Sequence, residues 1–446
     1  MTKKDLTIKI LVEISRIILG ATFIFSGFVK AVDPFGTAYK IEDYLAVFNL
    51  SSISFLAMPG SFLLCIVEFA MGACMLFGLY RKWNSRLMLL VMIFMTLLTL
   101  YLAIADPVDD CGCFGDALII TNWQTFYKNI VLLFCSIVVF RYHEYISNLF
   151  TGKTYWLAFL YIFIFIGLFT FRNYIYNPLF DFRPYKLGAN LPELMNVNEG
   201  QGRHEESLLV YAKDGIEKEF TEENYPWEDS TWVFVRMETK VIDEGISSPI
   251  KDFVINRLEF DPKKSELIDQ YDITQEVLSD SNYVFLMITP LLSKMSVSYL
   301  SSFEDIENYA NDYGYKFYCL TASPVDNIMS WARENVINFD FCTMDERTLK
   351  TIIRTNPGLL LLKNGTVINK WADIAVPAES ELIKPLNEMP YGQLKDVSTE
   401  NRKNLFYVFS IFLLPLLLLK GFDFLFYRKN KEEINAATDK KEEENI

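Results

Sequence analysis

Long apolar blocks flank a polar middle region in this chain. Six mostly apolar segments lie at roughly 9–31, 54–80, 87–105, 125–141, 154–172 and 404–427. A membrane-spanning helix needs about 20 apolar residues to cross a hydrocarbon core of about 30 Å. The pattern therefore predicts six spans. We interpret the first segment as a retained helix and not a secretory signal, because it is long, contains Arg16 and lacks a small-x-small cleavage site.

The loops between these segments differ in charge. Lys and Arg occur at the N-terminus, in the loops after the second and fourth segments and after the last segment, whereas residues 106–124 contain Asp but neither Lys nor Arg. Because Lys and Arg favour the cytosolic side, we expect cytosolic termini and an outer region of about 173–403. The tail at 428–446 is charged, which predicts a cytosolic, solvated stretch without fixed structure.

In the polar middle, strand and helix patterns alternate. Apolar runs predict strands at 283–288, 315–320 and 358–362, and residues 300–312, 325–334, 345–354 and 379–388 are typical of helices. Asn364-Gly365 predicts a hairpin turn into a strand at 366–371. Further upstream, residues 208–211 and 232–235 and a turn at Asp214-Gly215 predict a β-rich region.

This order of elements resembles the thioredoxin fold over about residues 280–390. Asn356-Pro357-Gly358 lies where that family carries its cis-proline, so the resemblance implies a groove beside Pro357 for an extended partner chain. Where the family places Cys-x-x-Cys, residues 289–295 read TPLLSKM without a cysteine, and neither Cys319 nor Cys342 matches the motif. We therefore expect this domain to be non-catalytic and to bind a partner.

The loop between the third and fourth segments contains Cys111-Gly112-Cys113. Two cysteines one residue apart can close a small, strained and readily reduced disulfide, and Gly112 and Gly115 permit the backbone angles that such a turn needs. Outside the cytosol such a pair can cycle. A static structural bridge is the alternative, and flanking acids, which raise a thiol pKa, disfavour a strongly nucleophilic pair. A metal site is disfavoured because no further soft ligand is near.

Ionisable residues within membrane spans are costly and commonly functional. Arg16, Lys30 and Glu68 are of this kind, and we expect a Glu68–Arg16 ion pair inside the bundle. That pair would be either structural or part of a site for a quinone or another polar headgroup. The cysteines at 65, 74 and 135 are interpreted as packing residues.

The stretch from Arg16 to Lys30, followed by Asp33-Pro34 and combined with Glu68 and the Cys-Gly-Cys-Phe-Gly loop, resembles the MauE branch of the DoxX/MauE group over about residues 8–145. That group comprises four-helix membrane proteins that accompany electron transfer or thiol oxidation outside the cytosol. MauE is linked to maturation of methylamine dehydrogenase, a disulfide-rich enzyme. The resemblance implies thiol–disulfide or quinone-linked redox chemistry.

We therefore expect a multi-domain protein with an α-helical transmembrane bundle of about six spans and an α/β thioredoxin-like extracytoplasmic domain. The expected parts are a DoxX/MauE-like membrane domain at 1–150, a fifth helix and linker at 151–180, a β-rich region at 181–280, a thioredoxin-like domain at 281–395, a last span at 404–427 and a tail at 428–446.

The favoured hypothesis is a protein of the bacterial inner membrane, with its large domain in the periplasm, that supports redox maturation of an envelope protein through Cys111 and Cys113. The alternative is a non-enzymatic assembly factor whose thioredoxin-like domain binds an envelope partner. A transporter ranks last, since no pair of broken helices is evident. The partners expected are membrane lipid and an envelope client. The net charge of −14, without a basic patch, argues against nucleic acid.

Overall fold

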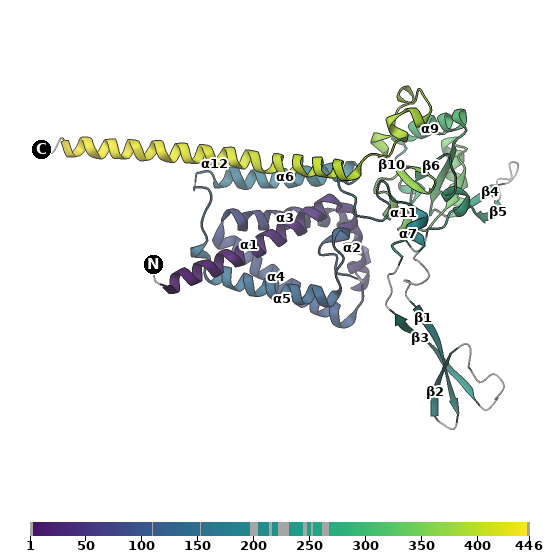
Figure 1. Cartoon of the computed structure of the whole chain (residues 1–446), viewed down its shortest axis with the longest axis horizontal. Coiled ribbons are helices and arrows are strands. Elements are labelled where there is room, and N and C mark those ends of the chain that lie inside the picture. Colours follow the sequence, from purple (N-terminus) through teal and green to yellow (C-terminus); the bar gives the residue numbers. More distant parts are fainter. Residues whose placement is uncertain are drawn as a thin grey trace. The chain divides into compact units, whose positions relative to one another are not determined.

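The computed structural model divides into two compact units (Figure 1). The membrane unit comprises Met1–Arg183 and Lys395–Ile446, and the sheet unit comprises Pro184–Leu394. The structure describes residues 3–108, 110–151, 153–196, 204–213, 216–221, 232–243, 248–250, 253–260 and 267–443.

The membrane unit is helical. Its long helices are α1 (Lys3–Val32), α2 (Pro34–Val47), α3 (Ala57–Phe77), α4 (Arg81–Ala105), α5 (Asn122–Arg141), α6 (Tyr155–Ile175) and α12 (Val397–Glu443). Within the described residues, five helical segments have the length and apolar composition of a membrane span: Ser51–Phe77, Arg81–Ala105, Asn122–Arg141, Tyr155–Ile175 and Val397–Leu425. They coincide with five of the predicted spans, so the chain is a multi-pass membrane protein. The first predicted span lies within α1, and its crossing of the membrane stays a prediction.

Helices α1 and α3 pack against each other in the membrane unit (Figure 1). A Cβ atom added to Gly27 of α1 would lie 2.4 Å from the backbone nitrogen of Phe69 in α3. One added to Gly72 of α3 would lie 2.6 Å from the nitrogen of Ile24 in α1. Small residues at such contacts let helix backbones approach each other within a membrane. This contact fixes which residues of α1 lie level with Glu68.

The predicted tail without fixed structure is wrong, because α12 continues as one helix to Glu443. The sequence from residue 431 onward is rich in Lys, Glu and Ala, which are strong helix formers. A charged composition does not by itself predict a lack of structure, because Glu and Lys also stabilise a solvated helix through pairs spaced four residues apart.

The sheet unit contains a mixed seven-stranded sheet in the order β10-β9-β6-β7-β8-β4-β5. Its strands are β4 (Asn256–Phe260), β5 (Leu267–Asp272), β6 (Tyr283–Ile288), β7 (Lys316–Thr321), β8 (Phe341–Thr343), β9 (Gly358–Lys363) and β10 (Thr366–Ala372). Strands β6, β7 and β8 are parallel, and the other pairings are antiparallel. The predicted strands at 283–288, 315–320, 358–362 and 366–371 are confirmed.

Helices cover both faces of this sheet. The remaining helices are α7 (Leu191–Met195), α8 (Thr274–Leu278), α9 (Leu300–Tyr313), α10 (Val325–Asn335) and α11 (Glu346–Ile352). Because side chains alternate along a strand, Phe285 and Met287 of β6 pack with α9 and α10. Leu286 and its neighbours on the other face pack with α7, α8 and α11. The sheet is thus the middle layer of an α/β domain, which explains its nearly continuous apolar strands.

A second sheet has three antiparallel strands in the order β2-β1-β3. Strands β1 (His204–Lys213) and β3 (Val233–Asp243) confirm the strands predicted at 208–211 and 232–235, and β2 covers Ile216–Thr221. The predicted turn at 214–215 lies outside the described residues. The helix predicted at 379–388 is wrong: this segment forms short 3-10 turns at Glu379–Glu381 and Leu386–Glu388. Pro385 separates them, and proline cannot donate the backbone hydrogen bond of a continuing helix.

Candidate functional site

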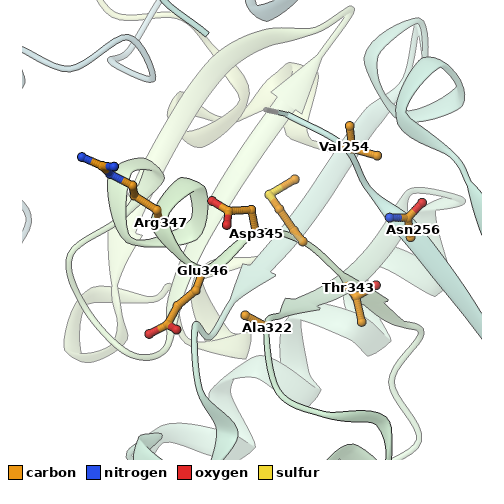
Figure 2. Close-up of a pocket in the computed structure, with 8 residues that line it drawn as sticks. Val254, Asn256, Ala322, Thr343, Asp345, Glu346 and Arg347 are labelled. Carbon is orange, nitrogen blue, oxygen red and sulfur yellow. The ribbon is translucent and has the colours of Figure 1, made fainter. Parts of the chain in front are cut away.

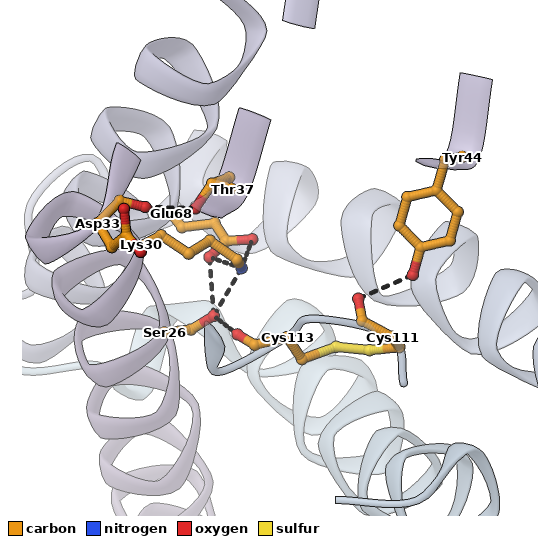
Figure 3. A network of polar contacts seen from close by, with 8 residues as sticks. All are labelled: Ser26, Lys30, Asp33, Thr37, Tyr44, Glu68, Cys111 and Cys113. Atoms are coloured by element: carbon orange, nitrogen blue, oxygen red, sulfur yellow. Dashed lines mark hydrogen bonds and ion pairs between the residues drawn. A yellow bond between two sulfur atoms is a disulfide. The ribbon is translucent and has the colours of Figure 1, made fainter. Parts of the chain in front are cut away.

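Cys111 and Cys113 form a disulfide in the loop between α4 and α5, with their Cα atoms 5.5 Å apart (Figure 3). Each cysteine is only 8% exposed. Gly112 and Gly115 have φ angles of +65° and +50°, which confirms the backbone conformation predicted for them. The two sulfurs are bonded to each other, so neither is a thiolate ligand for a metal in this state.

Side chains from α1 and α2 hold this loop by its carbonyl groups. The Tyr44 hydroxyl of α2 donates to the Cys111 carbonyl at 2.8 Å, and the Ser26 hydroxyl of α1 lies 2.7 Å from the Cys113 carbonyl (Figure 3). Burial, followed by the negative charges of Asp110 and Asp43, raises the pKa of Tyr44. The hydroxyl therefore stays protonated and remains a donor to the loop.

Lys40 of α2 neutralises one of the acids that flank the cysteines. Its ammonium lies 2.9 Å from the Asp110 carboxylate, and the same carboxylate accepts a 2.7 Å hydrogen bond from the Gly112 backbone nitrogen. The predicted unfavourable effect of Asp110 on the thiols is therefore partly offset by a cation 70 positions away in the chain.

A buried ion pair lies next to the cysteine loop. The Lys30 ammonium of α1 lies 2.8 and 2.6 Å from the two carboxylate oxygens of Glu68 in α3. It also donates to the Ser26 hydroxyl at 2.9 Å, and that hydroxyl lies 2.8 Å from Glu68. Lys30 and Glu68 are 5% and 9% exposed. Ser26 therefore connects the ion pair to the backbone of Cys113 (Figure 3).

The predicted Glu68–Arg16 pair is wrong. Arg16 pairs with Glu13 at 3.2 Å and donates to the carbonyls of Leu76 and Ser147. Gly27 contacts the residue next to Glu68, and Arg16 is 11 positions from Gly27, which is about 16 Å along a helix. Lys30 is less than one turn from Gly27, so it is the basic residue of α1 that reaches Glu68.

A further cation, Lys128 of α5, lies beside the cysteine loop and was not predicted to belong to the site. Its ammonium lies 4.2 Å from the centre of the Phe114 ring, and that ring packs against Phe25 with a centroid distance of 5.3 Å. Lys128 lies inside a predicted span, so the rule that singled out Lys30 and Glu68 should have found it. Ser26, Lys40 and Tyr44 carried no comparable signal, because they lie in ordinary helical patterns far along the chain from the cysteines.

Several of these groups line a small cavity of about 40 Å³. Its walls come from α1, α3, α4, α5 and the cysteine loop, and its lining residues include Ser26, Lys30, Glu68, Met95, Cys113, Phe114, Lys128 and Asn129. This volume has room for roughly three water molecules. It is too small for a quinone ring, so the residues in this arrangement do not fit that expected cofactor.

In the sheet unit, the Pro357 turn meets the loop that follows β6. The Asn356–Pro357 peptide is cis. The Thr289 hydroxyl donates to the Asn356 side chain at 2.7 Å, and Asn356 donates to the Leu291 carbonyl at 3.1 Å. The two segments compared with the thioredoxin fold are therefore neighbours. The predicted role of Pro357 in partner binding stays a prediction.

The two cysteines of the sheet unit are buried thiols of low reactivity. Cys319 in β7 and Cys342 in β8 are free and fully buried. They belong to the cores on opposite faces of the sheet. Burial raises the pKa of the Cys319 thiol, and burial followed by the charge of Asp340 raises the pKa of Cys342 to about 12. Neither is therefore a thiolate near neutral pH.

An open cleft lies where β4 and β8 meet the start of α11 (Figure 2). Its lining residues are Val254, Asn256, Ala322, Thr343, Met344, Asp345, Glu346 and Arg347. The Asp345 carboxylate accepts a 2.8 Å hydrogen bond from the Thr348 nitrogen and so caps α11. Among the described residues, no group of three or more His, Cys, Asp or Glu is arranged to hold a metal ion.

Two segments match protein-family models. Residues 205–244 match a domain of unknown function, DUF8463, and no curated protein matches the chain. Residues 8–142 match the family described as methylamine utilisation protein MauE. This second match runs from α1 to the end of α5 and includes Ser26, Lys30, Glu68, both loop cysteines and Lys128. In the region that holds the cysteine loop and its buried ion pair, this multi-pass membrane protein is therefore similar to the MauE family.

Proposed function

We propose that Cys111 and Cys113 are a redox pair that exchanges its disulfide with the dithiol of an envelope protein. The observation that carries this proposal is the disulfide itself, which joins residues only two positions apart. A disulfide stabilises a fold mainly by restricting the unfolded chain, and the effect is smallest for the shortest loops. A bridge that adds so little to stability is better explained by exchange chemistry than by a structural role.

The surroundings of the pair support the same function. Burying an ion pair is costly, and apolar residues of similar volume are often as stable or more so. The Lys30–Glu68 pair is nevertheless buried, and it is connected through Ser26 to the Cys113 carbonyl. Ionisable groups buried in a membrane bundle are typical of functional sites.

The exchange reaction balances without another reagent. A client thiolate attacks the Cys111 sulfur, the Cys111–Cys113 bond breaks, and its electron pair leaves on Cys113 as a thiolate. The second client thiolate then attacks the client sulfur of the mixed disulfide and releases Cys111, which takes up a proton. The client dithiol is oxidised to a disulfide, and the pair is reduced to a Cys111 thiol and a Cys113 thiolate. The reverse sequence would reduce a client disulfide.

We place the pair and the sheet unit outside the cytosol, in the periplasm of a bacterial inner membrane. The support is the absence of Lys and Arg from 106–124, in contrast to the basic loops on the opposite side. Disulfides also persist in oxidising compartments and not in the cytosol. This topology requires α1 to cross the membrane as a sixth span.

The sheet unit is proposed to hold the client as a non-catalytic thioredoxin-like domain. The parallel β6–β7 pair beside the antiparallel β9–β10 hairpin supports this fold, as does the contact between the Pro357 turn and the loop after β6. That loop contains no cysteine, which also favours the second candidate function, a membrane assembly factor that binds an envelope protein without redox chemistry.

Trapping of mixed disulfides in intact cells tests the redox function. The Cys113→Ser variant keeps Cys111 as a thiol without its resolving partner. Cys111 should attack the disulfide of an oxidised client and release one client thiolate, so reducible, higher-mass adducts should accumulate. The Cys111→Ser variant should accumulate fewer, because Cys113 faces the small cavity. The double variant is the background control. A wild-type pair that stays oxidised under reductant, with no adducts in either single variant, would contradict the proposal and favour the assembly factor.

A further inference from the structure

The cavity beside Cys113 has an excess of positive charge. Lys30, Lys128 and Glu68 all line it, and both oxygens of Glu68 are bonded to Lys30. No described carboxylate lies within ion-pair distance of Lys128, whose ammonium faces the Phe114 ring. Two cations and one anion leave a net charge of +1 in a poorly solvated place, which is costly within a membrane protein.

We propose that Lys128 compensates the charge of the Cys113 thiolate when the disulfide opens, and thereby favours the reduced state of the pair; this inference rests on the proposed redox function. Cys113 and Lys128 line the same cavity of about 40 Å³. Both residues therefore border one small space with room for roughly three water molecules. The cavity carries +1 in the disulfide state and is neutral with the Cys113 thiolate present.

The arrangement distinguishes the two cysteines. Cys113, and not Cys111, is among the residues that line the cavity with Lys128. On the Cys111 side the nearby cation is Lys40, which is already paired with Asp110. The Cys113 sulfur is therefore the better leaving group, because cations next to a thiol stabilise its thiolate. A disulfide whose reduced form is stabilised in this way is a stronger oxidant of client dithiols.

The test is a thiol–disulfide equilibrium of the full-length protein in detergent. Protein is equilibrated with glutathione buffers, and the reduced fraction is measured by alkylation and mass shift. Lys128→Met should lower the equilibrium constant for reduction about tenfold, which corresponds to a potential about 30 mV more negative. Lys128→Arg keeps the charge and should stay near wild type. Lys403→Met is the control and should stay near wild type, because it removes an exposed cation of α12 that is paired with Glu400.

A second readout follows Cys113 alone. In the Cys111→Ser background, the pH dependence of Cys113 alkylation reports its thiol pKa, and Lys128→Met should raise that pKa. The charged groups that line the cavity with Cys113 are Lys30 from α1, Glu68 from α3 and Lys128 from α5, while α4 contributes apolar residues. Only Lys128 changes in this experiment, and Lys128→Arg again reports whether the charge or the shape of the side chain matters.

The outcomes separate the two proposals. If the wild-type pair equilibrates with glutathione but Lys128→Met leaves both the equilibrium constant and the Cys113 pKa unchanged, the role of Lys128 is wrong and the redox function stands. If Lys128→Met and Lys128→Arg shift the equilibrium equally, shape and not charge is responsible, and the inference is likewise overturned. If the wild-type pair cannot be reduced at all, the redox function itself fails.

Discussion

The cysteines of the membrane unit and those of the sheet unit lie in opposite kinds of environment. The membrane unit joins its two loop cysteines and surrounds them with Lys30, Glu68 and Lys128. The sheet unit buries Cys319 and Cys342 in separate apolar cores. Its loop after β6, which the resemblance marks as the reactive one, has no cysteine at all. Under the proposed function, exchange chemistry would belong to the membrane unit, and the sheet unit would hold the client.

Ion pairs show the same division. Lys30–Glu68 is almost completely buried, with side chains 6% and 11% exposed. In the sheet unit, Lys316–Glu276 is comparably close, at 2.7 Å, but its side chains are 38% and 51% exposed. Water and salt screen the exposed pair, whereas Lys30 and Glu68 are bonded to each other and to Ser26 and are screened less. A Lys–Glu ion pair is therefore expected to affect the free energy of unfolding more in the membrane unit than in the sheet unit.

The largest expected effect is that of breaking the buried pair. Glu68→Leu or Lys30→Met alone leaves an uncompensated buried charge and should destabilise the protein by about 3–5 kcal/mol. The double variant removes both charges, and most of the loss should be recovered. Thermal unfolding of the full-length protein in detergent, followed by circular dichroism, measures these differences. Lys316→Met in the sheet unit is the control, with an expected loss of at most about 1 kcal/mol.

A result in which the double variant is as unstable as the single variants would mean that the two charges are held separately and not as a pair. A Lys316→Met loss as large as that of Lys30→Met would remove the distinction between the units. Redox assays on the double variant then show whether the pair serves only stability. If Ser26 and the ion pair position Cys113, the exchange rate falls even where stability is recovered.

The next effect concerns the contact between α1 and α3. Gly27→Ala places a methyl group 2.4 Å from the Phe69 nitrogen, so the helices must separate. Overpacking of this kind costs about 1–3 kcal/mol, and the displacement also moves Lys30 away from Glu68. Gly421→Ala in α12 is the matched control, because nothing lies within 4 Å of its added carbon. A lower unfolding temperature for Gly27→Ala, with Gly421→Ala at the wild-type value, is the expected result.

Equal unfolding temperatures for these two alanine variants would show that α1 and α3 have room to adjust. The Lys30–Glu68 distance would then depend on the side chains and not on the close helix contact. A fall in both temperatures would instead point to a general sensitivity of the membrane unit to added volume.

The sequence predicted the parts that depend on local pattern and missed those that depend on the pairing of distant helices. Apolar runs were enough to place five spans and the main strands, and the Cys-Gly-Cys spacing was enough to identify the loop. The partner of Glu68 was missed because Arg16 and Lys30 both lie in α1. Only the contact of Gly27 with Phe69 decides which of them is level with Glu68.

Other features of the site do have a signal in the sequence. Lys128 is a cation within a predicted span, so it belonged with Lys30 and Glu68 from the start. The α2 helix has Pro34 at its first turn and an Asp33 side chain that accepts from the Gly36 nitrogen, a familiar helix start. This signal places Lys40 and Tyr44 on one helix of the membrane unit, although not against the cysteine loop.

The smallest expected effect lies in the sheet unit and depends on pH. Burial, followed by the charges of Asp340 and Glu304, raises the pKa of Glu307 from 4.5 to about 7. Between these values the folded state binds more protons than the unfolded state, so stability should fall as pH rises through this range. Because Glu307 is only half-buried, screening should keep the change in unfolding free energy below about 1 kcal/mol.

Urea unfolding of the full-length protein, followed by tryptophan fluorescence at pH 5 and pH 7.5, measures the slope of stability against pH. Glu307→Gln should flatten it, and a variant that keeps the wild-type slope would assign the pH dependence to other groups.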